Sequence, residues 1–360
     1  MEKRDFIKPD GRGLTLYSRR PISPSILPTN PPHVEVMGTP HLRWHPLRGE
    51  WVAYAAHRQN RTFLPPKEYS PLAVTRSREF PTELPAGDYD IAVFENLFPS
   101  LTDRAQESPE LSIPTKPGKG HCEVVVFTQD PHTSLGALPL DHIELLLQVW
   151  ADRTRVIGSR EEIQYVMPFE NRGVEVGVTL HHPHGQIYCY PLVPPIPQRM
   201  FEMQSLYFEE NQRGLLEDLV QDEVIKQNRL IHEEERVVSF IPPCARYPYE
   251  TWIAPKRRSA WLYDLNNQEL KDFAKTLKTV LLKFDNLWNR TFPYLMVLYQ
   301  APTDGNVHPE SHVHIEIFPP LRTKDRLKYL AGTELGAGFF INDTLPEEKA
   351  AELRAVEVTL

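Results

Sequence analysis

Three polar side chains with alternating spacing are the first sign of chemistry in this sequence. His182, His184 and Gln186 lie two residues apart in the segment His-Pro-His-Gly-Gln. If the segment is a β-strand, all three side chains project from one face. A neutral imidazole can attack phosphorus, and an amide can donate to a non-bridging phosphate oxygen. The spacing therefore suits phosphoryl transfer.

The two residues between them constrain such a strand. Pro183 has no N–H to donate, which predicts a strand at a sheet edge or beside an irregularity. Gly185 has no Cβ, so we expect another group, such as a phosphate, to approach the backbone closely there.

Spacing alone leaves three interpretations open: a metal-ligand pair, a nucleophile, or a polar face without function. A metal site has to explain Pro183 and Gly185 and needs further ligands. A double cupin would also carry such histidine pairs on strands. It requires a Glu separated from the second histidine by three or four residues, and this chain has Tyr188 and Cys189 at those positions. We therefore reject the cupin interpretation.

The elements expected around this motif occur twice. The apolar period after residues 141–144, with Asp141 as cap, predicts a helix, and Asn266 with Glu269 predicts a second one. Apolar and β-branched runs predict strands at 42–44, 50–55, 91–97, 123–128, 164–170, 175–179, 252–255 and 294–299. Residues 61–88 are expected to form a long loop.

An offset of about 130 residues superimposes the two sets of elements. His182, His184 and Gln186 then match His312, His314 and Glu316. We infer a duplicated strand–helix–strand–strand unit. The long amphipathic helix in each copy argues against an all-β barrel.

The motif and several other segments are similar to those of one known family. The segment 182–186 resembles the active-site signature of the galactose-1-phosphate uridylyltransferases, a branch of the histidine-triad superfamily. The similarity covers roughly residues 42–354 and includes His57-Arg58-Gln-Asn-Arg61, Phe94-Glu-Asn96-Leu-Phe98, Phe169-Glu-Asn171-Arg-Gly173 with Gly177 and Thr179, Phe318-Pro-Pro-Leu-Arg322, and Leu327-Lys328-Tyr-Leu-Ala-Gly-Thr-Glu334.

This resemblance implies uridylyl transfer from UDP-glucose to galactose 1-phosphate by a ping-pong mechanism. The residue matching His184 attacks the α-phosphorus and becomes a covalent uridylyl-histidine. Gln186 matches a donor to the phosphate oxygens of that intermediate, and His182 is the other histidine of the signature. A backbone carbonyl within the signature is expected to hold the tautomer of the nucleophile.

Substrate contacts are implied in the same way. Arg58 and Arg61 match arginines that reach the nucleotide from the neighbouring subunit, so a homodimer with shared active sites is expected. The other matched residues are Asn96 and Phe98 for uridine, Asn171 and Thr179 for phosphate or ribose, Gly177 in the same run, and Lys328 and Glu334 for the hexose.

Two alternatives to uridylyl transfer remain. An ADP-sugar or dinucleoside-polyphosphate phosphorylase would use the same histidine to carry an adenylyl group. Asn96 and Phe98 favour uridine, whereas Leu97, which replaces an Asp of the family, permits the adenylyl alternative. A catalytically silent nucleotide- or metal-binding protein is a different class, and it rests only on lost metal ligands.

Those losses predict that the chain needs no cofactor. Ser70 and Ala73 stand where the family carries the cysteine ligands of a structural zinc, and only His182 and His132 are left of that site. Tetrahedral zinc needs four ligands, so we predict that no zinc is bound at this site. Whether a divalent ion binds near His308, His312, His314 and Glu316 stays open, and we expect a polar face there instead.

Composition sets the broad class. The 360 residues carry a formal charge of −8, which argues against nucleic-acid or membrane partners and leaves small-molecule substrates. Three separated cysteines and a start without an apolar core region predict a cytoplasmic location. We expect an α+β fold in which two histidine-triad-like units, residues 36–200 and 201–360, form an antiparallel half-barrel sheet covered by helices. Residues 1–35 are expected to form a loosely packed arm.

Overall fold

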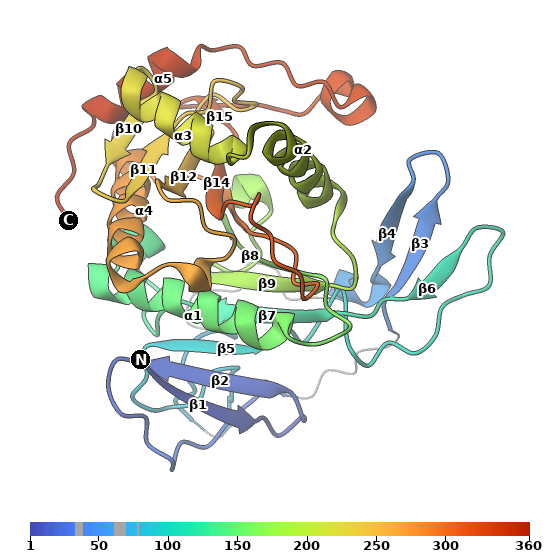
Figure 1. The fold of residues 1–360 in the computed structure, drawn as a ribbon. Coiled ribbons are helices and arrows are strands. Elements are labelled where there is room, and N and C mark those ends of the chain that lie inside the picture. The colour runs from blue at the N-terminus through green and yellow to red at the C-terminus, as the bar shows by residue number, and fades with distance from the viewer. Residues whose placement is uncertain (33–38, 61–69, 78) are drawn as a thin grey trace.

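The computed structural model describes residues 1–32, 39–60, 70–77 and 79–360. One antiparallel sheet of eleven strands runs through the whole molecule (Figure 1). In spatial order its strands are β1 (Glu2–Ile7), β2 (Gly13–Ser18), β5 (Ile91–Glu95), β7 (His121–Val126), β9 (His184–Tyr190), β8 (Tyr165–Arg172), β13 (Tyr294–Tyr299), β14 (His314–Phe318), β12 (Thr251–Pro255), β11 (Val237–Phe240) and β10 (Leu230–Glu233).

The remaining elements are helices and two small sheets. The helices are α1 (Leu140–Gly158), α2 (Pro195–Asn211), α3 (Leu215–Lys226), α4 (Asn267–Leu287) and α5 (Pro346–Ala355). Short helical turns are η1 (Ala56–Asn60), η3 (Leu135–Ala137), η4 (Val174–Val176), η5 (Leu262–Asp264) and η6 (Thr333–Ala337). The small sheets are β4 (Glu50–Tyr54), β3 (His41–His45) and β6 (Thr115–Pro117), and β15 (Leu321–Thr323) with β16 (Arg326–Leu327).

The strand order repeats in two halves. The N-terminal half contributes β2-β5-β7-β9-β8, and the C-terminal half contributes β13-β14-β12-β11-β10, its mirror order. Along the chain each half runs through three strands, a long helix and two strands. The predicted duplication is therefore confirmed, and it includes two more strands per copy than the sequence indicated. Strands β8 and β13 join the halves, and the expected boundary at residues 200 and 201 lies inside α2.

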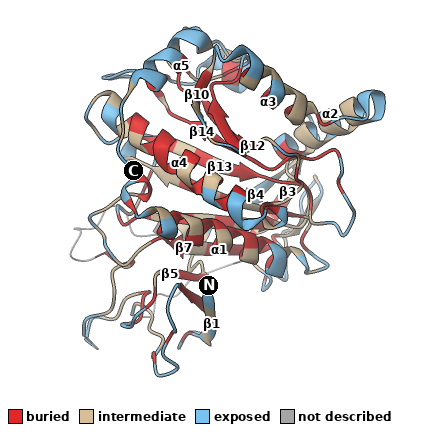
Figure 2. Cartoon of the chain, turned by 60° about the vertical axis from the view of Figure 1, so that its left-hand side comes forward, coloured by how far each residue is buried: buried red, intermediate tan, exposed pale blue. Residues whose placement is uncertain are grey.

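Helices α1 and α4 pack side by side on one face of the sheet, where their inner faces are buried (Figure 2). Apolar residues recur every three or four positions in α1, so Ile143, Leu147 and Trp150 all turn toward the core. The side chain of Asn266 accepts from the backbone N–H groups of Gln268 and Glu269, which confirms the predicted start of α4.

Two local predictions were wrong. Helix α1 begins at Leu140 after Pro139, and Asp141 lies in its first turn instead of capping it. Residues 175–179 do not form a strand, because the chain turns through η4 and leaves it at Gly177 with φ +77°. Glycine suits this left-handed conformation, which a strand excludes.

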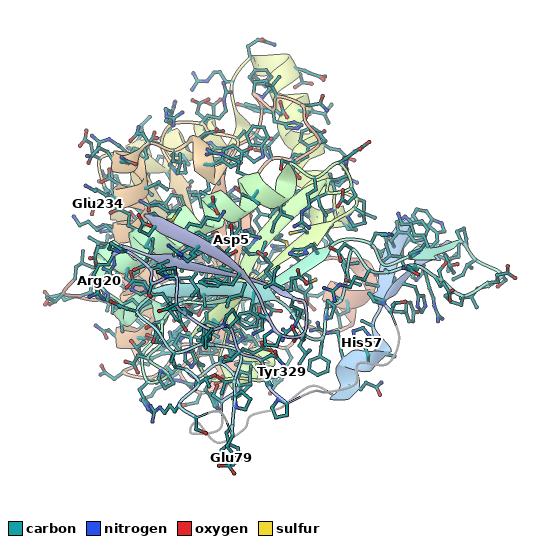
Figure 3. All side chains as sticks on the ribbon, turned by 90° about the horizontal axis from the view of Figure 1, so that it is seen from below. Asp5, Arg20, His57, Glu79, Glu234 and Tyr329 are labelled. Atoms are coloured by element: carbon teal, nitrogen blue, oxygen red, sulfur yellow. The ribbon has the colours of Figure 1, made fainter. Side chains whose placement is uncertain are left out.

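The expectation of a loosely packed N-terminal arm was also wrong. Strands β1 and β2 form a hairpin, and β2 pairs with β5 at the edge of the main sheet. Leu14 and Leu16 are buried on one face and Tyr17 on the other, because alternate residues of a strand point in opposite directions. The hairpin closes the lower end of the molecule in Figure 1 and faces the viewer in Figure 3, where Asp5 marks it.

The sheet face away from α1 and α4 is covered differently in the two halves. In the C-terminal half, Leu216 and Val220 of α3 pack on β11. In the N-terminal half, irregular segments that carry Ile22, Leu72 and Leu84 pack on β2 and β5. The irregular segments of the N-terminal half leave space on the sheet that α3 fills in the C-terminal half, so the N-terminal half can hold a cavity. Among the described residues, no helix has the length and apolar character needed to cross a bilayer.

Candidate active site

The predicted histidine strand lies in the interior of the sheet. Strand β9 pairs with β7 on one side and β8 on the other, so the first of the two positions that Pro183 predicted, a sheet edge, is wrong. The second, a position beside an irregularity, fits, because Pro183 lies in a bend. Pro183 precedes the first residue of β9 and therefore leaves the ladder intact. Its carbonyl accepts from the N–H of Phe127 at 3.1 Å.

His184 is held in one tautomer by its own motif. The carbonyl oxygen of His182 lies 2.7 Å from Nδ1 of His184, and a carbonyl can only accept. Nδ1 therefore carries the proton, and Nε2 keeps its lone pair. Burial lowers the pKa of His184, against the hydrogen bond to the His182 carbonyl, which raises it. The ring is thus neutral at neutral pH, as a nucleophile must be.

His182 supports this arrangement from the interior. Its Nε2 lies 2.7 Å from the carbonyl oxygen of Thr128, and only 2% of the residue is exposed. The C-terminal half repeats both contacts, since Nδ1 of His314 lies 2.9 Å from the His312 carbonyl and Nε2 of His312 lies 2.8 Å from that of Pro255. The second copy is buried, whereas His184 is half-buried beside two cavities.

The first cavity has a volume of about 210 Å³ and gathers six of the predicted site residues. They are Arg58, Asn96, Phe98, Thr179, His184 and Gln186. His184 and Gln186 project from the sheet face opposite α1, while Ile187 and Cys189 point into the core beneath that helix. The cavity therefore combines an apolar slot with polar groups around the reactive nitrogen.

One turn positions the expected uridine contacts. The N–H of Phe98 donates to Oδ1 of Asn96 at 2.9 Å, and Nη1 of Arg58 donates to the Phe98 carbonyl at 2.6 Å. Arg58 follows His57 on η1, which lies near the small sheet in Figure 3. Arg58 lines the cavity of its own chain. Its expected contribution to the site of a neighbouring subunit stays a prediction. Arg61 lies outside the described residues.

The second cavity, of about 420 Å³, opens on the other side of His184. Asn171 and His182 line it, as does Glu170. The hydroxyl of Tyr294 donates to Glu170 at 2.9 Å, and burial raises the pKa of Glu170 to about 7. Two cavities that meet at one imidazole give room for a group on each side of a transferred phosphoryl.

Three predicted substrate residues lie apart from these cavities. Gly177 is in an exposed turn and lines neither of them. Nζ of Lys328 donates to the Ile341 carbonyl and lies 3.7 Å from Glu334, which in turn accepts from the backbone N–H of Ala331. The segment of Lys328 and Glu334 is thus ordered by its own contacts, away from His184.

Gly185 has a different role from the one expected. A Cβ at this position would lie 2.7 Å from the Phe169 carbonyl oxygen and 2.8 Å from Cζ of Phe127. Both neighbours are protein, on the face opposite the cavity side of His184. Close packing of β9, and not the approach of a phosphate, therefore requires glycine here.

The first cavity is also lined by residues that the sequence analysis did not identify. Glu83, Leu72, Phe94, Val124 and Leu180 line it together with the predicted residues. Phe94 stands within a matched motif, and its strand alternation with Asn96 was a usable signal. Glu83 lies in what was expected to be a plain loop, where no pattern marked it.

The residues at the zinc position of the family do not fit that metal. Ser70 and Ala73 are joined by a backbone hydrogen bond in a turn, and neither supplies a thiolate. Nδ1 of His182 has no partner in the part of the chain that the structure describes. Within that part, no group of three or more His, Cys, Asp or Glu side chains is arranged to hold a metal ion, around His308, His312, His314 and Glu316 included.

Comparison with known proteins shows to which family the chain is similar. Residues 32–194 match the model of the galactose-1-phosphate uridyl transferase N-terminal domain, and residues 200–359 match that of the C-terminal domain. A galactose-1-phosphate uridylyltransferase of Thermotoga maritima is 38% identical over 89% of this chain and 99% of that protein. One of Streptomyces lividans is 31% identical over 99% of this chain and 98% of that protein.

Solved structures of two kinds of enzyme are similar to this chain. A structure of a uridylyltransferase has a TM-score of 0.77 at 31% identity and covers 88% of this chain and 97% of its own. An ADP-glucose phosphorylase from Arabidopsis thaliana with bound ADP-glucose has a TM-score of 0.67 at 26% identity and covers 89% of this chain and all of its own.

Proposed function

The chain belongs to the galactose-1-phosphate uridylyltransferase family, and from this premise we propose that it transfers a uridylyl group from UDP-glucose to galactose 1-phosphate through a covalent uridylyl-His184. The observation that carries the proposal is the tautomer of the His184 imidazole. Nδ1 of His184 donates to the His182 carbonyl, so Nε2 keeps its lone pair, and the residue lines both the cavity of Gln186 and that of Asn171.

The first half-reaction starts from the neutral imidazole. Its Nε2 attacks the α-phosphorus of UDP-glucose, a P–N bond forms, and the bond from that phosphorus to the bridging oxygen breaks. Glucose 1-phosphate leaves with the electron pair of that bond. The ring gains positive charge, which the His182 carbonyl stabilises through the proton on Nδ1.

The second half-reaction reverses these bonds with another sugar phosphate. A phosphate oxygen of galactose 1-phosphate attacks the uridylyl phosphorus, the P–N bond breaks, and UDP-galactose leaves neutral His184 behind. The amide of Gln186, in the same cavity, is proposed to donate to the phosphoryl oxygens, on which charge accumulates in both steps. No metal or other cofactor takes part in either step.

The cavities suggest how the substrates are held. Asn96 and Phe98 line the apolar cavity and are assigned to the nucleoside, with Arg58 bracing their turn. Thr179 on one side of His184 and Asn171 on the other are assigned to phosphate or ribose oxygens. Gly177 is assigned a backbone role, because its left-handed conformation ends the turn before Thr179.

A homodimer with shared sites is part of this proposal. Lys328 and Glu334, the expected hexose contacts, lie away from His184, and large apolar side chains of the same segment are exposed. They include Tyr329 (78% exposed), Leu335 (63%) and Phe339 (70%). An exposed apolar segment is typical of an interface.

Mixing two inactive variants tests whether the site is shared. If one site takes His184 from one chain and Lys328 from its neighbour, a mixture of His184→Ala and Lys328→Met chains should regain activity, and a mixture that stays inactive would exclude sharing of the site.

Intact-mass measurement tests the covalent step directly. Brief incubation with UDP-glucose, without acceptor, should add one uridylyl mass to the chain, and His184→Ala should add none. His314→Ala is the matched control, since it removes the equivalent imidazole of the C-terminal half and should still form the adduct. Labelling of His184→Ala would refute the assignment. An adenylyl adduct from ADP-glucose in place of the uridylyl adduct would favour the phosphorylase alternative.

A further inference from the structure

A buried cluster of charged residues connects the N-terminal hairpin to the cavity of His184. Nζ of Lys8 lies 2.6 Å from Oε2 of Glu83 and donates to the Glu83 carbonyl at 2.8 Å. Nη2 of Arg12 lies 2.9 Å from the same carboxylate oxygen, and Nε of Arg12 donates to Asp10 at 2.8 Å. Lys8, Arg12 and Glu83 are at most 5% exposed.

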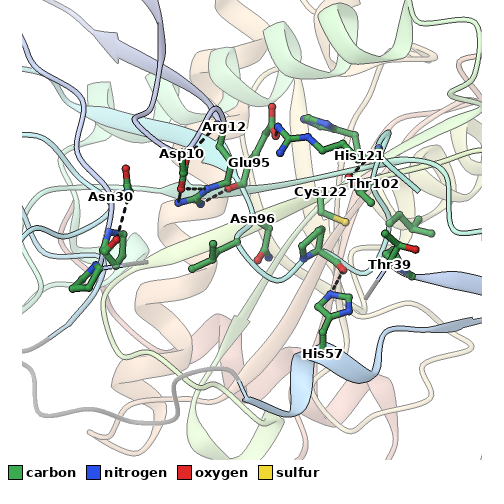
Figure 4. A pocket seen from close by; sticks show the side chains of 17 residues that line it. Asp10, Arg12, Asn30, Thr39, His57, Glu95, Asn96, Thr102, His121 and Cys122 are labelled. Atoms are coloured by element: carbon green, nitrogen blue, oxygen red, sulfur yellow. Dashed lines mark hydrogen bonds and ion pairs between the residues drawn. The ribbon is translucent and has the colours of Figure 1, made fainter. Parts of the chain in front are cut away.

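The same hairpin braces the wall of that cavity. Nη1 of Arg12 donates to the Glu95 carbonyl at 2.8 Å, directly before Asn96 (Figure 4). The ammonium group of Lys8 lies 4.9 Å from the ring centre of Phe94, which lines the cavity. The hairpin precedes the range that the family model matches, so the family signature says nothing about it.

We propose that the hairpin β1–β2 belongs to the nucleotide site: Lys8 and Arg12 hold the Glu83 carboxylate at the cavity wall, where it accepts a hydrogen bond from the nucleoside of the donor substrate. This inference rests on the proposed function, because it assigns the cavity beside His184 to a nucleotide. Glu83 is a specificity-determining residue, and Lys8 and Arg12 are positioning residues.

The chemistry of the lining residues supports this role. Among the described residues that line the cavity, Glu83 is the only carboxylate. An ionised carboxylate accepts hydrogen bonds and donates none, so it matches the ribose hydroxyls and the N3–H of uracil. It repels phosphate, which places the diphosphate at the other end of the cavity, beside His184 and Gln186.

The cost of burying this carboxylate is offset within the cluster. Lys8 and Arg12 balance the charges of Glu83 and Asp10, so the group as a whole is neutral. Burial lowers the pKa of Lys8, against the attraction of Glu83, which raises it. A chain that needed only to attach its hairpin could do so with apolar side chains at lower desolvation cost.

Calorimetric binding of UDP measures the contact without depending on catalysis. Glu83→Ala should weaken UDP binding about 10- to 100-fold, the loss expected for one hydrogen bond to a charged group. Lys8→Met should weaken it in the same direction. The matched control is Lys3→Met in the same hairpin. It breaks the 2.7 Å ion pair of Lys3 with Asp152 of α1 and should leave UDP binding unchanged.

UDP analogues separate a direct contact from a structural effect. Suitable analogues lack the ribose 2′-hydroxyl, lack the 3′-hydroxyl, or are methylated at N3 of uracil. At least one should bind the wild-type chain about 10-fold more weakly than UDP, and this penalty should vanish in Glu83→Ala. A merely structural role lowers the thermal stability but keeps every penalty.

The outcomes distinguish this inference from the function on which it rests. A uridylyl adduct in the wild type, together with UDP binding that is the same in Glu83→Ala, would overturn the role of Glu83 and leave the function standing. UDP binding that depends on Glu83, without any adduct, would support the inference and overturn the covalent mechanism. Penalties that persist in Glu83→Ala would also overturn the inference.

Discussion

Replacing Gly185 by alanine should damage both the stability and the activity of the protein. The added methyl group would lie 2.7 Å from the Phe169 carbonyl oxygen and 2.8 Å from Cζ of Phe127. The carbonyl belongs to β8 and the ring is completely buried against Trp150, so neither neighbour moves freely. Overpacking of this kind costs about 1–3 kcal/mol of unfolding free energy.

The same displacement reaches the reactive nitrogen. His184 precedes Gly185 in β9, and a shift of about 1 Å at a reacting atom reduces catalysis roughly 100-fold. We therefore expect Gly185→Ala to lower the melting temperature by a few degrees and kcat by about 10- to 100-fold. Thermal unfolding followed by circular dichroism and steady-state kinetics with UDP-glucose measure both effects.

A control and a clear refutation are available for this prediction. Gly336→Ala adds a methyl group with no heavy atom within 4 Å, so its melting temperature should match that of the wild type. If Gly185 instead admits a phosphate, Gly185→Ala raises KM for UDP-glucose and leaves the melting temperature unchanged. That result would refute the packing explanation.

Three further predictions concern titration, capping and metal content. Burial raises the pKa of Glu170 and of Glu250 to about 7, above the value near 4.3 of the unfolded chain. Folding therefore loses up to about 4 kcal/mol per group as the pH rises from about 4.3 through 7, and Glu170→Gln or Glu250→Gln should raise the melting temperature at pH 8 but not at pH 4. Equal effects at both pH values would contradict this. Asn266→Ala removes the cap of α4 and should cost about 1 kcal/mol in chemical denaturation, whereas an unchanged midpoint would show the cap to be dispensable. Elemental analysis should find less than one zinc per chain, since Ser70 and Ala73 offer no thiolate, and stoichiometric zinc would show that its ligands lie elsewhere.

Several patterns confined to a short stretch of chain predicted the structure correctly, although the expected Asp141 cap and the expected strand at residues 175–179 did not form. The spacing of His182, His184 and Gln186 placed two of the three side chains in one cavity, and the contact from His184 to the His182 carbonyl spans only two residues. The box formed by Asn266 and Glu269 is likewise local, and it marked the start of α4 correctly. The repeat at an offset of about 130 was visible because each copy keeps its own local pattern.

Contacts between distant segments were beyond such patterns. Lys8 and Glu83 are 75 positions apart, and no periodicity in either segment indicates that they meet. The alternation of Leu14, Leu16 and Tyr17 is compatible with a strand, but the pairing of β2 with β5 depends on residues some 75 positions later.

The sequence alone thus indicated which imidazole we propose as the nucleophile and that a carbonyl of the same motif would hold its tautomer, because both lie within one short stretch of chain; the structure identified that carbonyl as the one of His182. Only the tertiary structure decided what surrounds that imidazole: an interior strand, a glycine required by the Phe127 ring, an arginine from the same chain, and a carboxylate held by the N-terminal hairpin. Periodicity reports which side chains are buried, whereas the identity of their neighbours depends on how strands pair and loops fold over the sheet.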